Sequence, residues 1–318
     1  MSDIVCVGIC TVDAIGRTLD EYPPPGGLRL FDSLTITTGG NAVNCSFALA
    51  KMGIPCDLII KVGDDMLGRF VLAEAERHNI DTRGVIRDTT GTTTPFTFVC
   101  VHDTGQRSFL HTMGTNATLR REEIDMQIVT QARFCFVTGT MVMTAFDGQP
   151  TAELLRQAQA AGVITLLDTV YVDSAKNWQQ IIDPCLPHLD YFIPSEPEAV
   201  AITGQTDPAC MADYFQAKGC RNVVIKLGAA GAFWRDTTGN QGCCPAFAVP
   251  KVVDTTGAGD CWSAGFLAGL SRGESLSDAV EMGCATAAFN VQAVGASTGI
   301  KPLAEILRFR RTARRAGT

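Results

Sequence analysis

Short apolar runs alternate with helix-forming segments along most of this chain, and this alternation restricts the fold more than any other feature. Apolar runs of strand length occur at 4–9, 134–137 and 163–167, and segments of helical composition at 42–52 and 151–161 lie between them. Further strand-like runs are 58–62, 191–193 and 223–226, and a further helical segment is 66–78. Repeated strand–helix units predict a mostly parallel sheet with helices on both faces.

Residues 92–111 depart from this alternation. Thr, Phe and Val dominate 92–101, a turn sequence occupies 103–105, and 107–111 has strand character again. We therefore predict a hairpin here, and a further strand at 33–38. The hairpin is expected to be apolar on both faces, so a ligand, a second subunit or both should cover it.

Composition excludes several classes of function. The chain has 318 residues and a net charge of −7 without a large basic patch, which argues against a nucleic-acid partner. No apolar stretch is long enough to span a membrane. There are 13 cysteines, no CxxC pair and no secretory signal, so we expect reduced, mostly buried thiols in a cytoplasmic protein. The arginine-rich stretch 308–315 is expected to be a solvated, frayed helix end.

The segment 254–260, with the sequence DTTGAGD, carries the strongest chemical signal. An apolar strand at 247–253 should lead into this turn, and a helix should begin near Gly259. Gly257 and Gly259 allow backbone N–H groups to approach a ligand closely, and the helix dipole adds a preference for phosphate. Asp260 would lie in the first turn of the helix, where a carboxylate can accept the proton of a hydroxyl that attacks phosphorus.

This segment resembles, almost position by position, the signature of the ribokinase-like (PfkB) carbohydrate kinases. In that family the aspartate that matches Asp260 is the catalytic base. The backbone that matches Gly257, Ala258, Gly259 and Asp260 forms an anion hole for the transferring phosphoryl group. The resemblance implies an α/β, ribokinase-like three-layer sandwich with a mostly parallel central sheet and a small β-sheet lid. No Gly-Lys dipeptide occurs in the chain, so a P-loop is excluded.

The substrate side of the site is indicated by a second segment. Residues 39–44, GGNAVN, resemble the family's N-terminal signature, in which an asparagine stands four positions beyond the second of two glycines. Gly39 and Gly40 would let a polar substrate meet the backbone, and Asn44 offers both a donor and an acceptor. Asp13 matches the family's substrate-binding aspartate, and its carboxylate can accept hydrogen bonds from two sugar hydroxyls.

On the nucleotide side, the KLGAAG segment that begins at Lys226 resembles the family's glycine turn. The resemblance implies that Lys226, Gly228 and Gly231 contact ATP. Asn290 lies where the family often has a residue near the adenine. Asp168 ends a predicted strand, and it would either contact a ligand or support residues that do.

One departure from the family concerns the metal and the phosphates. The family commonly has Asn-x-x-Glu in the environment of Mg²⁺ and phosphate, but here Ser195 replaces the asparagine and Glu198 is kept. Glu198 is expected to hold Mg²⁺ indirectly, through water, and Ser195 to face the phosphates. The resemblance also implies a site for a monovalent cation, K⁺, near Asp254 and Gly295.

The resemblance covers nearly the whole chain and implies two domains. The large nucleotide- and substrate-binding domain comprises 1–12, 39–91 and 113–318, and the small β lid comprises 13–38 and 92–112. Family members dimerise through such lids, so we expect a homodimer formed in this way.

Three hypotheses for the function stay open at this point. The first is ATP-dependent phosphorylation of a hydroxyl of a sugar or sugar acid, with Asp260 as the base. The second keeps this chemistry and makes the acceptor a nucleoside. The third is a non-catalytic sugar-binding relative, which the serine at 195 favours and the intact 257–260 turn opposes.

Overall fold

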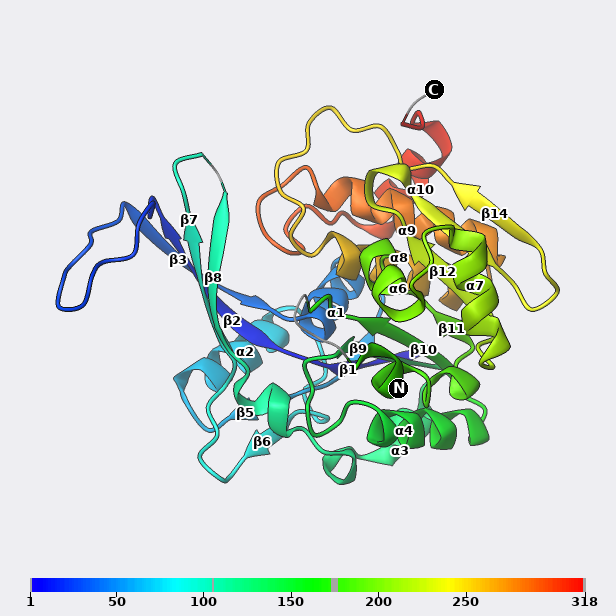
Figure 1. The fold of residues 1–318 in the computed structure, drawn as a ribbon, viewed down its shortest axis with the longest axis horizontal. Helices are drawn as coiled ribbons and strands as arrows, with labels where there is room; N and C mark the ends of the chain where they lie inside the picture. The colour runs from blue at the N-terminus through cyan, green and yellow to red at the C-terminus, as the bar shows by residue number, and fades with distance from the viewer. Residues whose placement is uncertain (1, 105, 173–176, 317–318) are drawn as a thin grey trace.

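The computed structural model describes residues 2–104, 106–172 and 177–316 (Figure 1). An eight-stranded sheet forms its centre, in the order β14-β13-β12-β11-β10-β9-β1-β4. The six parallel strands are β1 (Ile4–Gly8), β4 (Cys56–Ile59), β9 (Phe134–Thr140), β10 (Ile164–Thr169), β11 (Tyr191–Phe192) and β12 (Asn222–Lys226). At one end of the sheet, β13 (Ala232–Arg235) and the edge strand β14 (Gln241–Cys244) are antiparallel. The predicted mostly parallel α/β sheet is confirmed.

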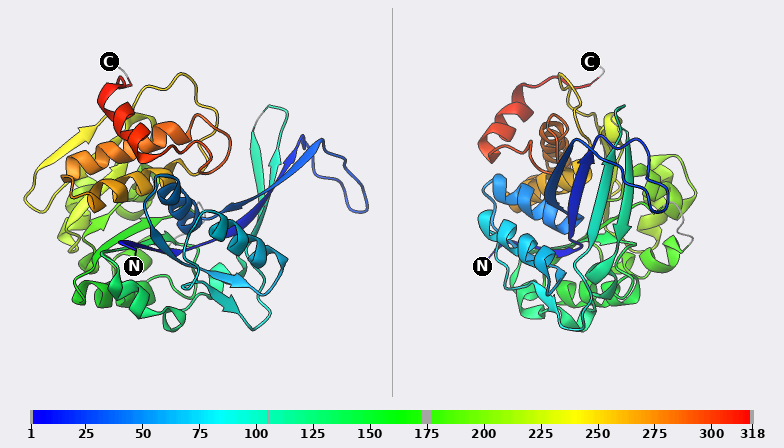
Figure 2. Two further views of the ribbon diagram at one scale, coloured as in Figure 1. Left: turned by 180° about the vertical axis from the view of Figure 1, so that it is seen from behind. Right: turned by 90° about the vertical axis from the view of Figure 1, so that its left-hand side faces the viewer.

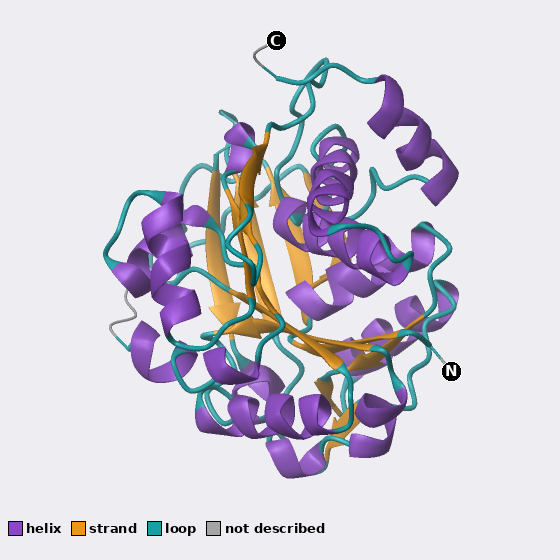
Figure 3. Cartoon of the chain, turned by 90° about the vertical axis from the view of Figure 1, so that its right-hand side faces the viewer, coloured by secondary structure: helices purple, strands orange, loops and turns teal. Residues whose placement is uncertain are grey.

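Helices cover both faces of this sheet, as Figure 3 shows. One apolar core contains residues of α1 (Asn41–Lys51), α2 (Met66–Arg77), α8 (Ala258–Ser271), α9 (Leu276–Asn290) and α10 (Leu303–Thr312). The other contains residues of α3 (Met126–Gln131), α4 (Gln149–Ala160), α5 (Trp178–Ile182), α6 (Glu196–Thr203) and α7 (Pro208–Ala217). Single 3₁₀ turns are η1 (Gly114–Thr118), η2 (Arg121–Glu123), η3 (Leu186–His188) and η4 (Gly228–Ala230).

The continuous apolar character of the central strands follows from this arrangement. Successive side chains of a strand point to opposite faces of its sheet. In β1, Ile4 and Cys6 enter the core that contains α1, whereas Val5 and Val7 enter the core that contains α4. Because both faces are covered, such a strand is expected to be apolar on both sides along most of its length.

A second, four-stranded sheet projects from one side of the molecule (Figures 1 and 2). Its order is β3-β2-β7-β8, with β2 (Thr11–Arg17), β3 (Ser33–Gly39), β7 (Phe96–Val101) and β8 (Arg107–Thr112). The predicted hairpin is therefore confirmed as β7–β8, and the strand at 33–38 as β3. A two-stranded ribbon of β5 (Lys61–Gly63) and β6 (Ile86–Asp88) lies at its base, so the single strand predicted at 58–62 is divided between β4 and β5.

Both faces of the β7–β8 hairpin carry apolar side chains, as predicted, because Val99 pairs with Phe109 on one face and Phe98 with Leu110 on the other. The first of these faces also carries polar side chains. Asp13, Thr97 and His111 are cross-strand neighbours and share one face. The Oγ1 of Thr97 and the Nδ1 of His111 are hydrogen-bonded at 3.0 Å. The opposite face carries Ile36 and Leu110, which are 52% and 55% exposed. One face therefore combines polar groups with apolar side chains, whereas the other is an apolar surface.

Two further sequence predictions are wrong near the C-terminal end. Residues 247–253 form no strand, because Pro250 lacks an N–H and only Phe247 makes a bridge, to Arg315. The arginine-rich stretch is not frayed: Arg315 forms an ion pair with Glu281, and its guanidinium lies 3.9 Å from the centre of the Phe247 ring. The backbone N–H of Ala248 donates to the carbonyl of residue 314 at 2.9 Å.

All thirteen cysteines are free thiols, and eleven of them are buried, as expected; Cys210 and Cys243 are exposed. In the part of the chain that the structure describes, no helix has the length and apolarity needed to cross a bilayer.

Replacing Phe136 with alanine should destabilise the fold strongly. Phe136 is fully buried at the centre of β9, and such a truncation leaves a cavity that costs about 3–5 kcal/mol. Urea unfolding followed by circular dichroism measures this loss. Leu28→Ala, at a side chain 87% exposed, should change the free energy of unfolding by less than about 0.5 kcal/mol. Equal effects of the two substitutions would contradict the assignment of the core.

Candidate active site

The candidate site lies where parallel strands of the large sheet end at their carboxyl termini. Asp168 is near the end of β10 and Lys226 is the last residue of β12. The N-terminal turns of α1 and α8 reach the same place, because α1 supplies Asn41 and Asn44 to contacts with Asp260 of α8. Ligands of open α/β sheets bind in crevices at this edge.

The shape of the turn at 257–260 depends on its two glycines, which have no side chains. Gly257 caps α8 with φ of 68°, and a Cβ there would lie 2.2 Å from the carbonyl oxygen of Ala296. Ala258 begins the helix. A Cβ on Gly259 would have the Nζ of Lys226 as its nearest neighbour, at 3.6 Å. The N-terminal end of α8 therefore lies beside a positive charge, which is an environment suited to an anion.

Asp260 is buried and held by two amides. Its Oδ1 accepts from Asn41 Nδ2 at 2.7 Å and its Oδ2 from Asn44 Nδ2 at 2.8 Å. Burial raises the pKa of Asp260 to about 7, with a further contribution from the charge of Asp168, against the lowering effects of the amides and Lys226. A carboxylate with a pKa near neutrality is well matched to accepting a proton at physiological pH.

A compact charge network lies beside Asp260. The Nζ of Lys226 contacts Asp168 Oδ2 at 2.6 Å, and Ser263 Oγ donates to the same oxygen at 3.2 Å. Burial would lower the pKa of Lys226, but the charges of Asp168 and Glu198 outweigh it and leave the pKa raised. Lys226 is therefore a permanent cation at the turn, and Asp168 is the residue that orients it.

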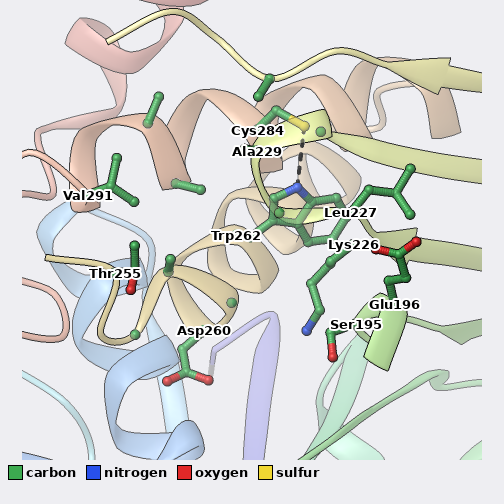
Figure 4. A pocket seen from close by; sticks show the side chains of 18 of the residues that line it. Ser195, Glu196, Lys226, Leu227, Ala229, Thr255, Asp260, Trp262, Cys284 and Val291 are labelled. Carbon is green, nitrogen blue, oxygen red and sulfur yellow. Dashed lines mark hydrogen bonds between the residues drawn. The ribbon is translucent and has the colours of Figure 1, made fainter. Parts of the chain in front are cut away.

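Ser195 and Glu198 flank this network from α6. Ser195 caps the helix, and its backbone N–H donates to Glu198 Oε2 at 2.6 Å. Burial raises the pKa of Glu198, whereas Lys226 lowers it. Ser195 lines the same cavity as Lys226 and Asp260, as Figure 4 shows.

The cavity itself has a volume of about 950 Å³ and two chemically different ends. Its charged end contains Asp260, Lys226 and the 257–259 turn (Figure 4). Gly228 and Gly231 also line it. Its apolar end is formed by Phe247, Val249, Val252, Ala287, Ala288 and Val291. Such a cavity fits a ligand with a polyanionic end and a flat apolar end.

On the other side of Asp260, the small sheet supplies Asp13. Gly39 must be a glycine, since its Cβ would lie 2.4 Å from Asp13 Oδ2. Gly40 has φ of 92° and starts α1, which carries Asn44. Burial raises the pKa of Asp13, and hydrogen bonds from Thr97 and Thr11 act against this. The segment 39–44 therefore contacts both Asp13 and Asp260 and brings the two carboxyl groups to one site.

Three of the predicted site positions also have contacts within the protein. Asn290 is fully buried, and its Nδ2 donates to the carbonyl of Thr256 at 2.8 Å, so it supports the turn from behind. Gly231 packs against β14, where a Cβ would lie 2.0 Å from the carbonyl oxygen of Cys244. Asp254 accepts from the backbone N–H of Gly295 at 2.9 Å.

Two residues of the site were missed by the sequence reasoning. Asn41 lies three positions before Asn44, on the same side of α1, and this spacing could have indicated it. Arg107 of β8 forms an ion pair with Asp254 at 3.0 Å. No sequence signal links these two, because they are far apart in the chain and meet only through the fold.

Comparison with known proteins agrees with this geometry. The crystal structure of ribokinase from Thermotoga maritima superposes with a TM-score of 0.84 at 26% identity, covering 98% of this chain and all of that one. Arabidopsis thaliana ribokinase, complexed with ribose and ATP, superposes with a TM-score of 0.86 at 22% identity, covering 98% and 99% of the two chains. The fold is that of the ribokinases, a three-layer α/β arrangement with a small second sheet.

Sequence relatives define the family. A model of the pfkB family of carbohydrate kinases matches residues 1–302. The 2-dehydro-3-deoxygluconokinase of Bacillus subtilis is 31% identical over 92% of both chains, and the ribokinase of Staphylococcus aureus is 27% identical over 95% of this chain and 98% of its own. This chain therefore belongs to the pfkB family and is a carbohydrate kinase.

The raised pKa of Asp260 predicts a pH dependence of stability. The folded protein keeps a proton on this group up to about pH 7, whereas the unfolded chain releases it near pH 3.8. The free energy of unfolding should therefore fall as the pH rises from 4 to 7, by on the order of 4 kcal/mol from this group. The Asp260→Asn side chain does not titrate, so the variant should lack this fall in the free energy of unfolding. It should therefore be more stable than the wild type at pH 8. Urea unfolding of the wild type and the variant at pH 5 and pH 8 measures this difference. An identical pH dependence of the two proteins would rule out the contribution of Asp260.

Proposed function

We propose that the chain is an Mg-ATP-dependent kinase in which Asp260 is the general base and the 257–260 turn binds the transferring phosphoryl group. The observation that carries this proposal is the position of Asp260. Its buried carboxylate lies in the wall of the nucleotide-sized cavity and is joined through 39–44 to the polar face of the small sheet. Donor and acceptor would thus meet on its two sides.

In this mechanism each residue acts on a particular part of ATP or of the acceptor. The triphosphate of ATP occupies the charged end of the cavity, and its base the apolar end. The N–H groups of the turn and the Nζ of Lys226 stabilise charge on the γ-phosphoryl oxygens. Asp260 accepts the proton of the acceptor hydroxyl as its oxygen attacks phosphorus. General-base catalysis of this kind contributes roughly 10²- to 10⁴-fold.

The described residues fit Mg²⁺ held mainly by the nucleotide. No group of three or more His, Cys, Asp or Glu side chains among them could hold a metal ion. Glu198 is close to Lys226 and has one oxygen engaged by Ser195, and in this proposal it would bind a water of the metal. Mg²⁺ would supply charge neutralisation of the phosphates, and Ser195 can donate to them through its hydroxyl.

The acceptor is a sugar or sugar acid, the class that sequence relatives are named for. Asp13 and Asn44 would hold its hydroxyls, and Thr97 and His111 extend the polar face on which it rests. The small sheet, with the segments 13–38 and 92–112, would act as a lid that excludes water, which otherwise consumes ATP by hydrolysis.

The opposite face of the lid supports a homodimer. Leu34, Ile36 and Leu110 are each about half exposed on it. Ile36 and Leu110 belong to one cross-strand row with Ala14 and Phe98. Exposed apolar surface of this kind marks an interaction site, and a second copy of the same face would cover it.

Asp260→Asn should lower phosphoryl transfer by 10²-fold or more without unfolding the protein, because asparagine has no basic oxygen of comparable strength. ADP release from Mg-ATP should be measured across ribose, fructose, 2-dehydro-3-deoxygluconate and 5-dehydro-2-deoxygluconate. Asp64→Asn is the matched control, since Asp64 is 74% exposed on the side chain and forms only a surface ion pair with Arg69. Full turnover by Asp260→Asn would eliminate Asp260 as the base.

The double substitution Ile36→Asp with Leu110→Asp should convert the dimer to a monomer. Four carboxylates would then face one another across a two-fold interface, where like charges repel. Sedimentation velocity of the wild type and the double variant measures the change. A wild-type protein that sediments as a monomer at all concentrations would disprove the dimer.

A further inference from the structure

Arg107 connects the small sheet to the glycine-rich turn of the active site. It is the first residue of β8, and its Nη2 forms an ion pair with Asp254 Oδ1 at 3.0 Å. Its Nη1 donates to the Oγ1 of Thr256, a residue 149 positions away in the chain. Within the described residues, this is the one ion pair that joins the small sheet to the rest of the protein.

Asp254 is the centre of this connection. Its side chain is only 4% exposed. One carboxylate oxygen accepts from the N–H of Thr256 at 2.8 Å and the other from the N–H of Gly295 at 2.9 Å. Burial would raise its pKa, but these N–H groups, together with Arg107, hold the pKa at about 2. Asp254 is therefore an anion at all relevant pH values, and a buried anion needs a compensating cation.

The guanidinium of Arg107 supplies that positive charge from the protein itself. Gly295 directs its N–H at the carboxylate of Asp254. An N–H directed at the carboxylate repels a metal ion, whereas a guanidinium adds donors that match the remaining lone pairs. The pair Asp254 and Gly295 therefore does not fit the monovalent-cation site expected from the sequence.

We propose that Arg107 is a positioning residue that makes the shape of the phosphoryl-binding turn depend on the small sheet being closed. Its guanidinium fixes Asp254 and Thr256, the residues that lead directly into Gly257. This proposal rests on the function proposed above for the turn and for Asp260.

The contacts of Arg107 would require the small sheet to close before the phosphoryl group is transferred. When the small sheet swings away, Arg107 leaves, Asp254 keeps a buried charge without its cation, and the Thr256 hydroxyl loses its donor. The turn then relaxes from the geometry that stabilises the phosphoryl group. Because the acceptor lies under the small sheet, the turn is complete only with the acceptor enclosed, and transfer to water is suppressed.

Arg107→Ala is the principal test. Phosphoryl transfer should fall about 10- to 100-fold, the dissociation constant of Mg-ATP should change less than about threefold, and the ratio of acceptor-independent ATP hydrolysis to transfer should rise at least tenfold. Added guanidinium ion at millimolar concentration should restore part of the transfer rate. The matched control is Arg29→Ala, at an arginine in the loop between β2 and β3 that forms an ion pair with the exposed Glu21. This variant should match the wild type and show no rescue.

A double-mutant cycle with Asp254→Asn distinguishes a specific interaction between Arg107 and Asp254 from a general loss of folding. If Arg107 acts through Asp254, the double variant should be no worse than the worse single variant. The proposal is overturned if Arg107→Ala transfers within twofold of the wild type, if guanidinium gives no rescue, or if the two losses multiply. Loss of transfer in Asp260→Asn beside a fully active Arg107→Ala would refute this proposal alone. A fully active Asp260→Asn would refute the assignment of the base instead.

Discussion

The contact between the Asp260 carboxylate and the two amides of α1 is the interaction on which the site depends. Asn41 and Asn44 come from the first helix of the chain, and Asp260 comes from the eighth, more than two hundred residues later. A buried carboxylate is costly unless its oxygens are hydrogen-bonded, so the two helices must meet at this point with their N-terminal turns together. Both glycine-rich segments of the sequence thereby enter one site.

The surroundings of Asp260 have opposing effects on the pKa of its carboxyl group. Burial disfavours its charge, whereas two amide donors and the nearby Lys226 favour it, and the balance leaves its pKa near 7. Lys226 can act in this way only because Asp168 holds its ammonium group at 2.6 Å. The residue pair at the ends of β10 and β12 is thus part of the electrostatics of Asp260 even though neither lies on α8.

Sequence reasoning predicted the parts of this protein that are encoded locally. The apolar runs of β1, β9 and β10, the small-residue turn at 257–260 and the hairpin at 96–112 each have a signature within a few residues. It failed where the outcome depends on distant partners. The run 247–253 is apolar like a strand, but Phe247 and Ala248 pair with the C-terminal segment instead. Arg310 and Arg315 of that segment have their partner on α9, Glu281. Arg107 carries no local signal at all, since its role exists only once the two sheets face each other.

The C-terminal segment has a practical consequence for work on this protein. Ala316 lines the cavity, and its backbone N–H donates to the carbonyl of Ala246 in the opposite wall segment. The guanidinium of Arg315 lies over the Phe247 ring of the same wall. Ala316 and Arg315 therefore hold the segment that contains Ala246 and Phe247 in this wall of the cavity. Variants made to study the cavity should keep both residues intact.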